Sequence, residues 1–458
     1  MTLLEEFGRF IEDCQGRSFS PSVLHHARRA LLDWHGALIA GSNTDTAQML
    51  RQAYAEELGV GKCSIAGTTH KTFSRAAAFM NGTISHISEF DDIFRDGAYH
   101  PACPTISAAF ALAESRGDSI GNLLAAIIVG YEVSTRISKV IQPSHYEFFH
   151  TTGTAGVFGA ASACAYLLRL NASQACDALA TAGTFASGLQ QAFRSDSMTK
   201  PMHPGHAAEV GLNAALVAQA GMTGTPDLLE GDAGFGAALC KNPRWGELFE
   251  GLGSSWNIEQ MTFKNHGCCG HNFPAIDAVS HLLDQHPIDP REIARIRVGG
   301  YRATKEVCKY IHPKTAFEAK FSLTYTVSAR IILGRVREKA FLPDALGNPE
   351  IDALEDKVEL FIDQECAEKF PLHRSAKVEI EMHNGLVYKH HQHTRHGDPD
   401  EPLTDQELLD KFIELTEPRM GLLRAQALSD ALLQKSSVSP VSGLSKIWAG
   451  VSHELDIQ

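Results

Sequence analysis

The hydrophobic pattern changes once along the chain, and the change separates two kinds of structure. From the N-terminus to residue 263, apolar residues recur every three or four positions, which predicts α-helices. Leu3, Phe7 and Ile11 show this spacing in the first segment. Glycines stand between or just after the apolar runs, where helices commonly end. We therefore expect residues 1–263 to form a helical domain.

Small residues dominate the middle of this helical region. Residues 104–221 are rich in alanine, glycine and serine at helical spacing. Small side chains let helices approach closely, so this composition predicts a compact bundle. Earlier in the chain, Ser20 followed by Pro21 predicts a helix start, because serine caps helices and proline suits the first helical position.

A β-hairpin is predicted in the second half of the chain. Val378, Ile380 and Met382 alternate with polar residues and are followed by Asn384 and Gly385. Asn-Gly favours the type I′ turn that joins two antiparallel strands, so this segment predicts a hairpin.

The region around the hairpin is expected to be a mixed α+β domain over residues 264–397. It includes a strand near 296–298, which follows a short helix capped by Asp289. Residues 396–402 have the composition of a linker, and residues 398–458 are expected to be helical again. The pattern alone leaves open whether this last segment rejoins the first domain.

Composition and charge exclude some classes of function. The 458 residues carry a formal net charge of −13, which argues against a broad surface for nucleic acid or an anionic membrane. The longest apolar run, Leu123–Val129, is too short to span a bilayer, and the acidic N-terminal segment favours an amphipathic helix over a signal peptide. Ten scattered cysteines without a CxxC motif favour reduced thiols in the cytoplasm.

The first chemical candidate is the stretch from Asn81 to Pro104. It contains Glu89, Asp91, Asp92 and His100 between apolar helices, where charged groups are costly unless they are paired or used. His100 could be a general acid or base, or bind a carboxylate, with the acids orienting it. A helix cap or a salt-bridged loop explains the same residues equally well.

Two further candidates precede small-residue helices. His150 stands before Thr-Thr-Gly, and a helix N-terminus suits an anionic substrate. Lys200, with His203 close behind, could pair with a substrate carboxylate or exchange a proton. The alternatives are a capping histidine and a solvated loop lysine.

A fourth group stands at the predicted domain junction and combines lysine, histidine and cysteine: Lys264, His266, Cys268, Cys269 and His271. Ligand sites often lie at such junctions. A zinc site or a two-thiol racemase is conceivable, but the spacing matches no standard zinc pattern and adjacent cysteines rarely face one substrate.

Tyr325 is the last candidate, as a proton donor or as a buried structural tyrosine. The histidines near the hairpin could hold a metal, although a wet polar face is the better explanation: His390, His391, His393 and His396. The chain has no convincing dinucleotide fingerprint, Walker loop, HExxH or GxSxG motif. We therefore expect neither a cofactor nor a metal, and proton-transfer chemistry on a small anionic molecule.

Several segments together resemble the MmgE/PrpD family, in the same order and over nearly the whole chain: EFDD, the following HP, GYEVSTRI, FHTTGTAGVFGAA, TKPMHPGHAAEVGLNAALVAQAGMTG, LEGDAGFG and AKFSLTY. That family includes 2-methylcitrate dehydratase, cis-aconitate decarboxylase and iminodisuccinate epimerase. The resemblance implies a mainly α fold, in which a large helical domain is built from both chain ends and a smaller α+β lid domain is inserted. It also implies a homodimer and an active site between domain and lid.

The resemblance also implies the roles of the candidate residues. The catalytic residues would be His100, His150, Lys200 and Tyr325. The acidic residues match the family pattern and would bind the substrate: Glu89, Asp91 and Asp92. The residue types add four further substrate-binding candidates: His203, Lys264, His266 and His271. The implied chemistry is metal-free proton transfer on a di- or tricarboxylate, first of all a 2-methylcitrate dehydratase-like reaction. Decarboxylation of cis-aconitate, epimerisation of iminodisuccinate, or a catalytically inactive carboxylate-binding homologue are the alternatives.

Two positions depart from the family pattern. Ile93 follows the acid pair, where dehydratase and decarboxylase members typically have threonine. Phe273 stands where many members place a histidine, for which His271 or the Cys268-Cys269 pair are candidate substitutes. Both departures lie where substrate is expected, so the substrate stays open.

Overall fold

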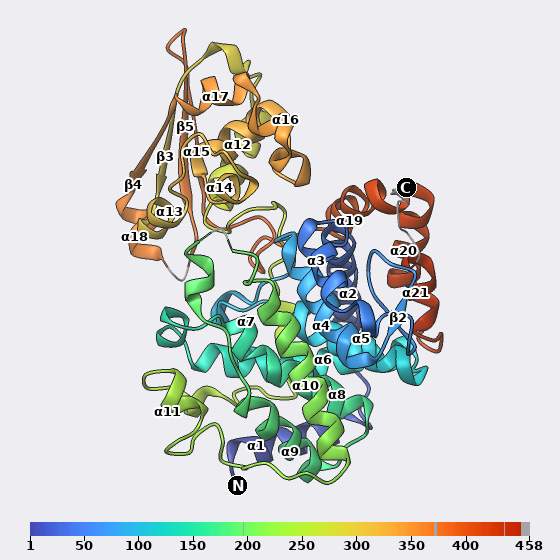
Figure 1. The fold of residues 1–458 in the computed structure, drawn as a ribbon. Helices are drawn as coiled ribbons and strands as arrows, with labels where there is room; N and C mark the ends of the chain where they lie inside the picture. Colours follow the sequence, from blue (N-terminus) through green and yellow to red (C-terminus); the bar gives the residue numbers. More distant parts are fainter. Residues whose placement is uncertain (196, 371–372, 435, 450–458) are drawn as a thin grey trace. The chain divides into compact units, whose positions relative to one another are not determined.

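The computed structural model describes residues 1–195, 197–370, 373–434 and 436–449 (Figure 1). The fold is mainly α-helical, as predicted. The chain folds into two compact units. Unit 1 comprises Met1–Thr262 and Asp405–Gln458, and unit 2 comprises Phe263–Thr404.

Unit 1 consists mostly of helices. A short antiparallel pair of strands, β1 (Cys63–Ser64) and β2 (Lys71–Thr72), precedes α4. Its helices are α1 (Leu3–Cys14), α2 (Pro21–Gly41), α3 (Asp45–Ala53), α4 (Ser74–Ile87), α5 (Ala102–Arg116), α6 (Ile120–Val140), α7 (Thr151–Thr154), α8 (Gly156–Leu167), α9 (Ala172–Thr184), α10 (Met202–Gln219), α11 (Phe235–Leu239), α19 (Asp405–Met420), α20 (Leu422–Gln434) and α21 (Ser442–Trp448).

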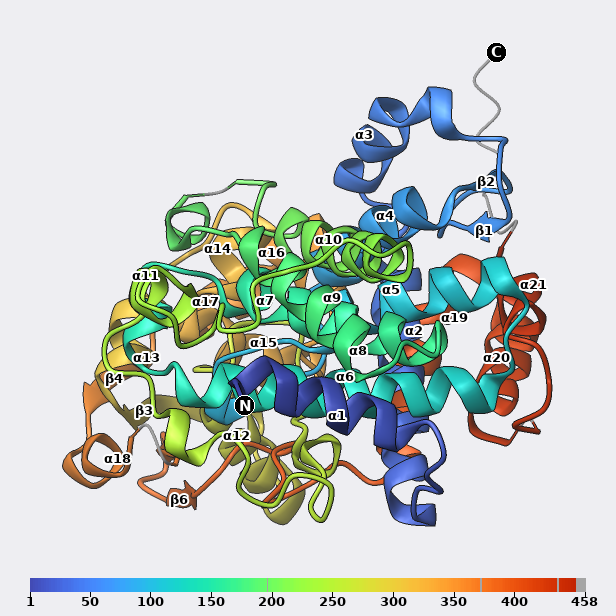
Figure 2. The ribbon, with the colours of Figure 1, turned by 90° about the horizontal axis from the view of Figure 1, so that it is seen from below.

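Helices α19 and α20 pack against α2, and Figures 1 and 2 both show α19 beside it. A buried ion pair joins the two ends of the chain, because Lys411 Nζ lies 2.6 Å from Asp33 Oδ1. The start of α2 is as predicted: the Ser20 side chain accepts a hydrogen bond from Val23 N, and Pro21 is the first helical residue.

Glycines bring α4 and α10 into close contact. A Cβ atom on Gly205 would collide with the carbonyl oxygen of Phe79, and one on Gly82 would lie 2.9 Å from the α-carbon of Gly205. The end of α4 therefore lies beside the start of α10. This packing brings the loop that carries Glu89 to the segment that carries Lys200.

Helix α6 is long and apolar enough to cross a membrane, by length and composition only. From the sequence, only the shorter run Leu123–Val129 was considered, which did not predict a helix of this kind. In unit 1, however, 89% of its apolar window is buried. The helix also carries a buried ion pair, with Arg136 Nε 2.6 Å from Glu132 Oε1. These features are typical of the core helix of a globular unit.

Unit 2 contains a four-stranded sheet in its described residues, with the order β4-β3-β5-β6. The strands are β3 (Ile293–Gly300), β4 (Val358–Ile362), β5 (Ala376–Met382) and β6 (Val387–Gln392). Strands β3 and β4 are parallel, and the other pairs are antiparallel. The predicted hairpin is confirmed, because β5 and β6 are joined through Asn384 and Gly385, whose φ is 86°.

Figure 1 shows helices α12 and α15 beside the sheet of unit 2. Leu282 of α12 and Val327 of α15 share a hydrophobic cluster with Val378 of β5. The helices of unit 2 are α12 (Phe273–Gln285), α13 (Arg302–Val307), α14 (Ala316–Lys320), α15 (Leu323–Leu333), α16 (Pro343–Leu346), α17 (Pro349–Glu355) and α18 (Gln364–Lys369).

Two local predictions need correction. The helix expected after Asp289 is a single 3₁₀ turn, Pro290–Glu292, because strand β3 begins at once. The segment expected as a linker, residues 396–402, is a folded part of unit 2. A buried ion pair between Arg395 and Asp398, 2.6 Å from Nη2 to Oδ1, holds it.

Candidate active site

Unit 1 gathers several of the predicted site residues at helix ends. His100 lies just before α5, His150 just before α7, and Lys200 just before α10, while Glu89 follows the end of α4. The His100 backbone N–H donates to Thr152 Oγ1 over 3.2 Å, which ties the loop before α5 to α7. The N-terminus of a long helix such as α10 carries a partial positive charge, which favours an anionic ligand beside Lys200.

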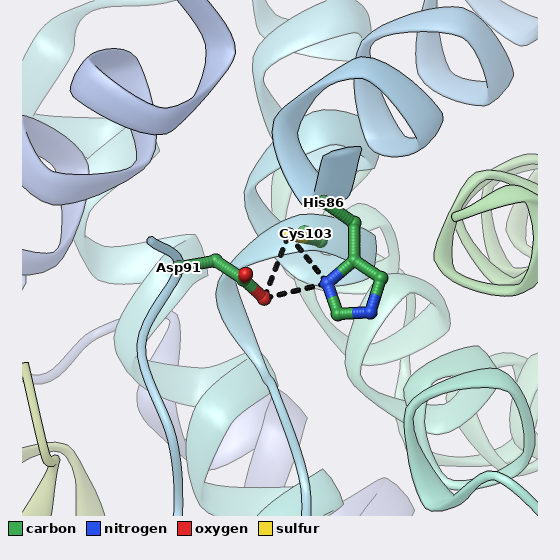
Figure 3. Close-up of side chains that lie close together, drawn as sticks. All are labelled: His86, Asp91 and Cys103. Atoms are coloured by element: carbon green, nitrogen blue, oxygen red, sulfur yellow. Dashed lines mark hydrogen bonds and ion pairs between the residues drawn. The ribbon is translucent and has the colours of Figure 1, made fainter. Parts of the chain in front are cut away.

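Asp91 lies close to His86 and Cys103 (Figure 3) and also contacts His100. Its Oδ2 atom lies 2.7 Å from His86 Nδ1 and 3.0 Å from His100 Nδ1. The Cys103 thiol donates to the same oxygen over 3.3 Å. Burial and the charge of Asp91 raise the pKa of Cys103, so this thiol stays protonated and acts as a donor.

The contacts with Asp91 orient the two imidazoles, and their exposed fractions differ. An ionised carboxylate only accepts hydrogen bonds, so His86 carries a proton on Nδ1 and directs Nε2 away from Asp91. His100 makes an ion-pair contact with the same oxygen through its Nδ1 atom. The His86 side chain is 0% exposed, whereas that of His100 is 15% exposed. His100 is therefore the imidazole of this pair that a substrate can reach.

A second pair of imidazoles lies beside the first. His150 Nδ1 is 3.0 Å from His203 Nδ1, and the ring centroids of His150 and His100 are 6.5 Å apart. Burial lowers the pKa of His150 well below its usual range, and His86 and Lys200 lower it further. Burial, followed by the charges of His86 and Lys200, lowers the pKa of His203 to about 4. Both rings are neutral at pH 7 in this structure.

Lys200 forms an ion pair with Glu89. Its Nζ also lies 5.2 Å from the centre of the Phe193 ring, a cation–π contact. Glu89 has a φ of 61°, in the left-handed region that non-glycine residues seldom adopt. Such conformations persist where the surrounding structure imposes them, and they cluster at functional sites.

Both carboxyl oxygens of Asp92 accept hydrogen bonds from other residues of unit 1. Its Oδ1 accepts from Ala102 N over 3.0 Å and its Oδ2 from the Tyr131 hydroxyl over 2.8 Å. The side chain is fully buried. The structure therefore gives Asp92 a role in fixing the start of α5, and its predicted contact with substrate stays a prediction. The local pattern around Asp92 does not show that a tyrosine of α6 reaches it.

The remaining predicted residues lie in unit 2. Lys264 and His266 are buried, and His266 Nε2 donates to Asp277 Oδ1 over 2.8 Å. His271 Nδ1 forms a hydrogen bond of 2.8 Å with the Tyr301 hydroxyl. Burial, helped by Arg374 and Arg395, lowers the pKa of His271 to about 3. Within unit 2, each of these two histidines is therefore oriented by a partner.

Tyr325 is buried in unit 2, and its hydroxyl donates to the carbonyl oxygen of Ala340 over 2.5 Å. Burial, with smaller effects from Glu355 and Asp352, raises the pKa of this phenol. The geometry within unit 2 matches a structural tyrosine, and the catalytic role stays a prediction.

From the sequence, no site role was assigned to His86 or Cys103. Both lie inside helices, where a single polar residue among alanines attracts little attention. One signal was the position of His86 on a small-residue helix, five residues before an aspartate. Local spacing gave no corresponding signal for Cys103, because only folding brings the first turn of α5 to Asp91.

Two sets of side chains among the described residues have ligand atoms close enough together to hold a metal ion: His86, Asp91 and Cys103, and in unit 2 His312, Asp352 and Glu355. The first set is explained by the hydrogen bonds at Asp91. In the part of the chain that the structure describes, Cys268, Cys269 and the hairpin histidines join no such set.

Comparison with known proteins shows the family to which the chain belongs. The family models of the MmgE/PrpD N-terminal and C-terminal domains match residues 5–248 and 266–435. A cis-aconitate decarboxylase-like protein, oryM, of Aspergillus oryzae is 26% identical over 97% of this chain and 97% of its own length. Human cis-aconitate decarboxylase is 26% identical over 90% of this chain and 87% of its own.

The mouse cis-aconitate decarboxylase gives a similar match, 24% identical over 90% of this chain and 86% of its own length. Because the two domain models together cover most of the residues, the resemblance inferred from the sequence is confirmed. The chain belongs to the MmgE/PrpD family, a family of lyases and related enzymes.

Proposed function

We propose that this protein is a lyase that decarboxylates a small tricarboxylate, with cis-aconitate as the first compound to test. The observation that carries the proposal is the contact of Asp91 Oδ2 with both His86 Nδ1 and His100 Nδ1. A carboxylate that orients an accessible imidazole creates a general acid or base, and Lys200 stands beside it to hold an anion. The similarity to cis-aconitate decarboxylases supports the choice of substrate.

The reaction can be written with the residues of unit 1. Lys200 and the N-terminus of α10 bind the carboxylates that stay on the product. The bond from carbon to one carboxylate breaks, carbon dioxide leaves, and the electron pair is delocalised into the conjugated carboxylate that remains. His100, protonated on both nitrogens, then delivers its Nε2 proton to carbon and is reprotonated by water. Asp91 stabilises the imidazolium form of His100 before that transfer.

A second candidate is supported by the separation of two imidazoles. The ring centroids of His100 and His150 lie 6.5 Å apart, and their planes are inclined at 65°. Epimerisation of iminodisuccinate needs a base on each side of one carbon, and two imidazoles on different elements could supply them. The dehydration of 2-methylcitrate would instead need one group to take a proton from carbon and another to protonate the leaving hydroxyl.

The deciding experiment is a substrate panel followed by NMR in deuterated water. The full-length protein is incubated with cis-aconitate, 2-methylcitrate, citrate or iminodisuccinate. Decarboxylation of cis-aconitate, abolished in His100→Gln, is expected. Dehydration of 2-methylcitrate, or exchange at iminodisuccinate without loss of carbon dioxide, would select an alternative reaction. Neither turnover nor exchange with any compound would refute catalysis and favour a carboxylate-binding homologue.

A further inference from the structure

We propose that unit 2 contains a binding site for a divalent transition-metal ion of the Zn²⁺ type, formed by His312, Asp352 and Glu355. These residues lie in unit 2 and take no part in the site around Asp91, His100 and Lys200 in unit 1. The inference therefore goes beyond the proposed function. One ligand atom from each of the three side chains lies within 4.8 Å of the others. Their burial, hydrogen bonds and chemistry each point to a cation.

The three residues come from two segments that are already fastened together. Asp352 and Glu355 are three residues apart on α17, so they share one face of that helix. His312 lies in the loop before α14, and its backbone N–H donates to Glu355 Oε1 over 2.9 Å. Thr324 Oγ1 donates to the same oxygen over 2.5 Å. The Oε1 atom of Glu355 is thus fixed by two donors.

The other oxygen of Glu355 is the main evidence. The side chain is 0% exposed, and Oε2 has no hydrogen-bond partner among the described residues. A buried carboxylate oxygen without a donor is costly, so it calls for a positive partner. Oε2 faces His312 Nδ1 at 3.6 Å, and Asp352 Oδ1 lies 3.8 Å from the same nitrogen. The space between the three atoms is the proposed ion position.

The opposite nitrogen of His312 is arranged as in known metal sites. His312 Nε2 donates to Asp356 Oδ1 over 2.9 Å. A ligating histidine almost always donates its second N–H to a carboxylate or carbonyl, which fixes the tautomer and makes the ligand nitrogen more basic. Ion binding requires the neutral ring with its proton on Nε2, in which the lone pair of Nδ1 is directed toward Asp352 and Glu355.

The donor set indicates the class of ion. One imidazole nitrogen and two carboxylates suit Zn²⁺, which often takes three protein ligands and leaves a fourth position for water. Ligand atoms about 2.1 Å from a tetrahedral ion lie roughly 3.4 Å apart, so the two separations measured from His312 Nδ1, 3.6 and 3.8 Å, need to shrink by only a few tenths of an ångström. Ca²⁺ and Mg²⁺ prefer oxygen ligands alone, and they serve as negative controls.

The ion would stabilise unit 2. It would fasten the His312 loop to α17, and through the Thr324 hydrogen bond to the start of α15. Any ligand that binds the folded form and not the unfolded chain raises the unfolding temperature. The expected effect is therefore a higher unfolding temperature, and the proposal can be tested without measuring turnover.

The test is titration of the untagged full-length protein with Zn²⁺, by calorimetry and by equilibrium dialysis with metal analysis. The native chain is expected to bind Zn²⁺ saturably and not Ca²⁺. Asp352→Asn should weaken this binding at least tenfold, because it removes a ligand from a half-exposed position where the fold tolerates the change. Asp356→Asn should weaken it by roughly ten- to a hundredfold through the histidine.

Two controls separate this site from other candidates. Cys103→Ser addresses the Asp91 cluster, and His391→Gln combined with His393→Gln addresses the hairpin; both variants should bind Zn²⁺ as the native chain does. Zn²⁺ should also raise the unfolding temperature of the native protein and not that of Asp352→Asn. The proposal is overturned if no saturable Zn²⁺ binding occurs, or if Asp352→Asn binds Zn²⁺ as tightly as the native chain.

Discussion

His150 and His203 face each other through the same kind of nitrogen, with Nδ1 atoms 3.0 Å apart. A hydrogen bond at this distance needs one donor and one acceptor, so the two rings share a single proton between these atoms. The low pKa values of both residues agree with this arrangement. The site without substrate thus holds a neutral imidazole pair next to the cation Lys200.

This pair is expected to take up protons when an anion binds. Both pKa values lie below 6.5 without ligand, and that of His203 is about 4. Carboxylates placed beside the rings favour their charged forms and raise both pKa values toward neutrality. Binding of the unreactive tricarboxylate tricarballylate near pH 6.5 should therefore consume a fraction of a proton per site. Calorimetry in buffers of different ionisation enthalpy measures this uptake.

The matching variant is His203→Gln, which keeps a polar side chain and removes one titrating group. It should bind tricarballylate with a smaller proton uptake than the native chain. Proton release, or an uptake that the variant leaves unchanged, would show that this pair does not sense the substrate charge.

Two adjacent aspartates give a matched test of the site. Asp91 orients His100, so Asp91→Asn should lower kcat by roughly ten- to a hundredfold with little change in KM, as expected for loss of a carboxylate that orients a functional imidazole. Burial and the Asp33 carboxylate raise the pKa of Asp92 well above its usual range, so the neutral amide of Asp92→Asn is a close substitute. That variant should keep kcat and lose about 1–2 kcal/mol of stability.

The measurements are the pH dependence of kcat for each variant and a urea titration. Only Asp91→Asn should shift the limb of the pH profile that reports His100, and it should shift it to lower pH, because the carboxylate favours the imidazolium. Equal losses of kcat in both variants would mean that Asp91 acts through folding alone.

Lys200 and Glu89 should affect anion binding in opposite directions. Lys200→Met removes the cation that would bind a carboxylate of the ligand. A hydrogen bond to a charged group contributes about 1.5–3 kcal/mol, so the variant should bind tricarballylate roughly ten- to hundredfold more weakly. Glu89→Gln removes a negative charge that competes for Lys200, so the same probe should bind more tightly. Calorimetric dissociation constants test both changes.

Lys241→Met is the control for a general effect of charge, because that lysine is highly exposed and lies 3.8 Å from Glu147 at the surface. It should leave the dissociation constant of tricarballylate unchanged. If Glu89→Gln weakens binding as Lys200→Met does, the carboxylate holds the lysine in place and does not compete with the substrate.

The sequence predicted the site residues that stand next to helix-breaking or helix-capping residues. His100 precedes a proline, His150 a Thr-Thr-Gly segment and Lys200 a proline, and such breaks mark helix ends where side chains converge. The partners of these residues could not be predicted in the same way. Tyr131 is in the middle of α6, and its contact with Asp92 depends on how two helices pack.

The fold was likewise predictable only where neighbouring residues determine the structure. The hairpin through Asn384 and Gly385 was predictable, because its turn is encoded by two neighbouring residues. Strand β4 was not predicted, since Val358–Ile362 carries little alternation and pairs in parallel with β3, far away in the sequence. Long-range pairing leaves no signal in a local pattern.

Buried histidines should also make unit 1 sensitive to acid, and His35 gives the clearest test. Its ring is fully buried, its Nδ1 donates to Leu31 O over 2.8 Å, and it packs against Trp34 and Phe110. Burial lowers its pKa from 6.5 to about 4. The unfolded chain therefore binds a proton in a range of pH where the folded unit does not, and stability is lost as pH falls from 6.5 toward 4.

The expected size follows from that shift. Between pH 7.5 and pH 5, His35 should account for about 2 kcal/mol of lost unfolding free energy, and His35→Phe should reduce the loss by that amount. Tryptophan fluorescence in urea reports this change selectively, because all four tryptophans belong to unit 1. His70→Gln, at an exposed position, should leave the loss unchanged. An equal acid sensitivity of His35→Phe and the native chain would mean that the buried imidazole of His35 is not the group that titrates.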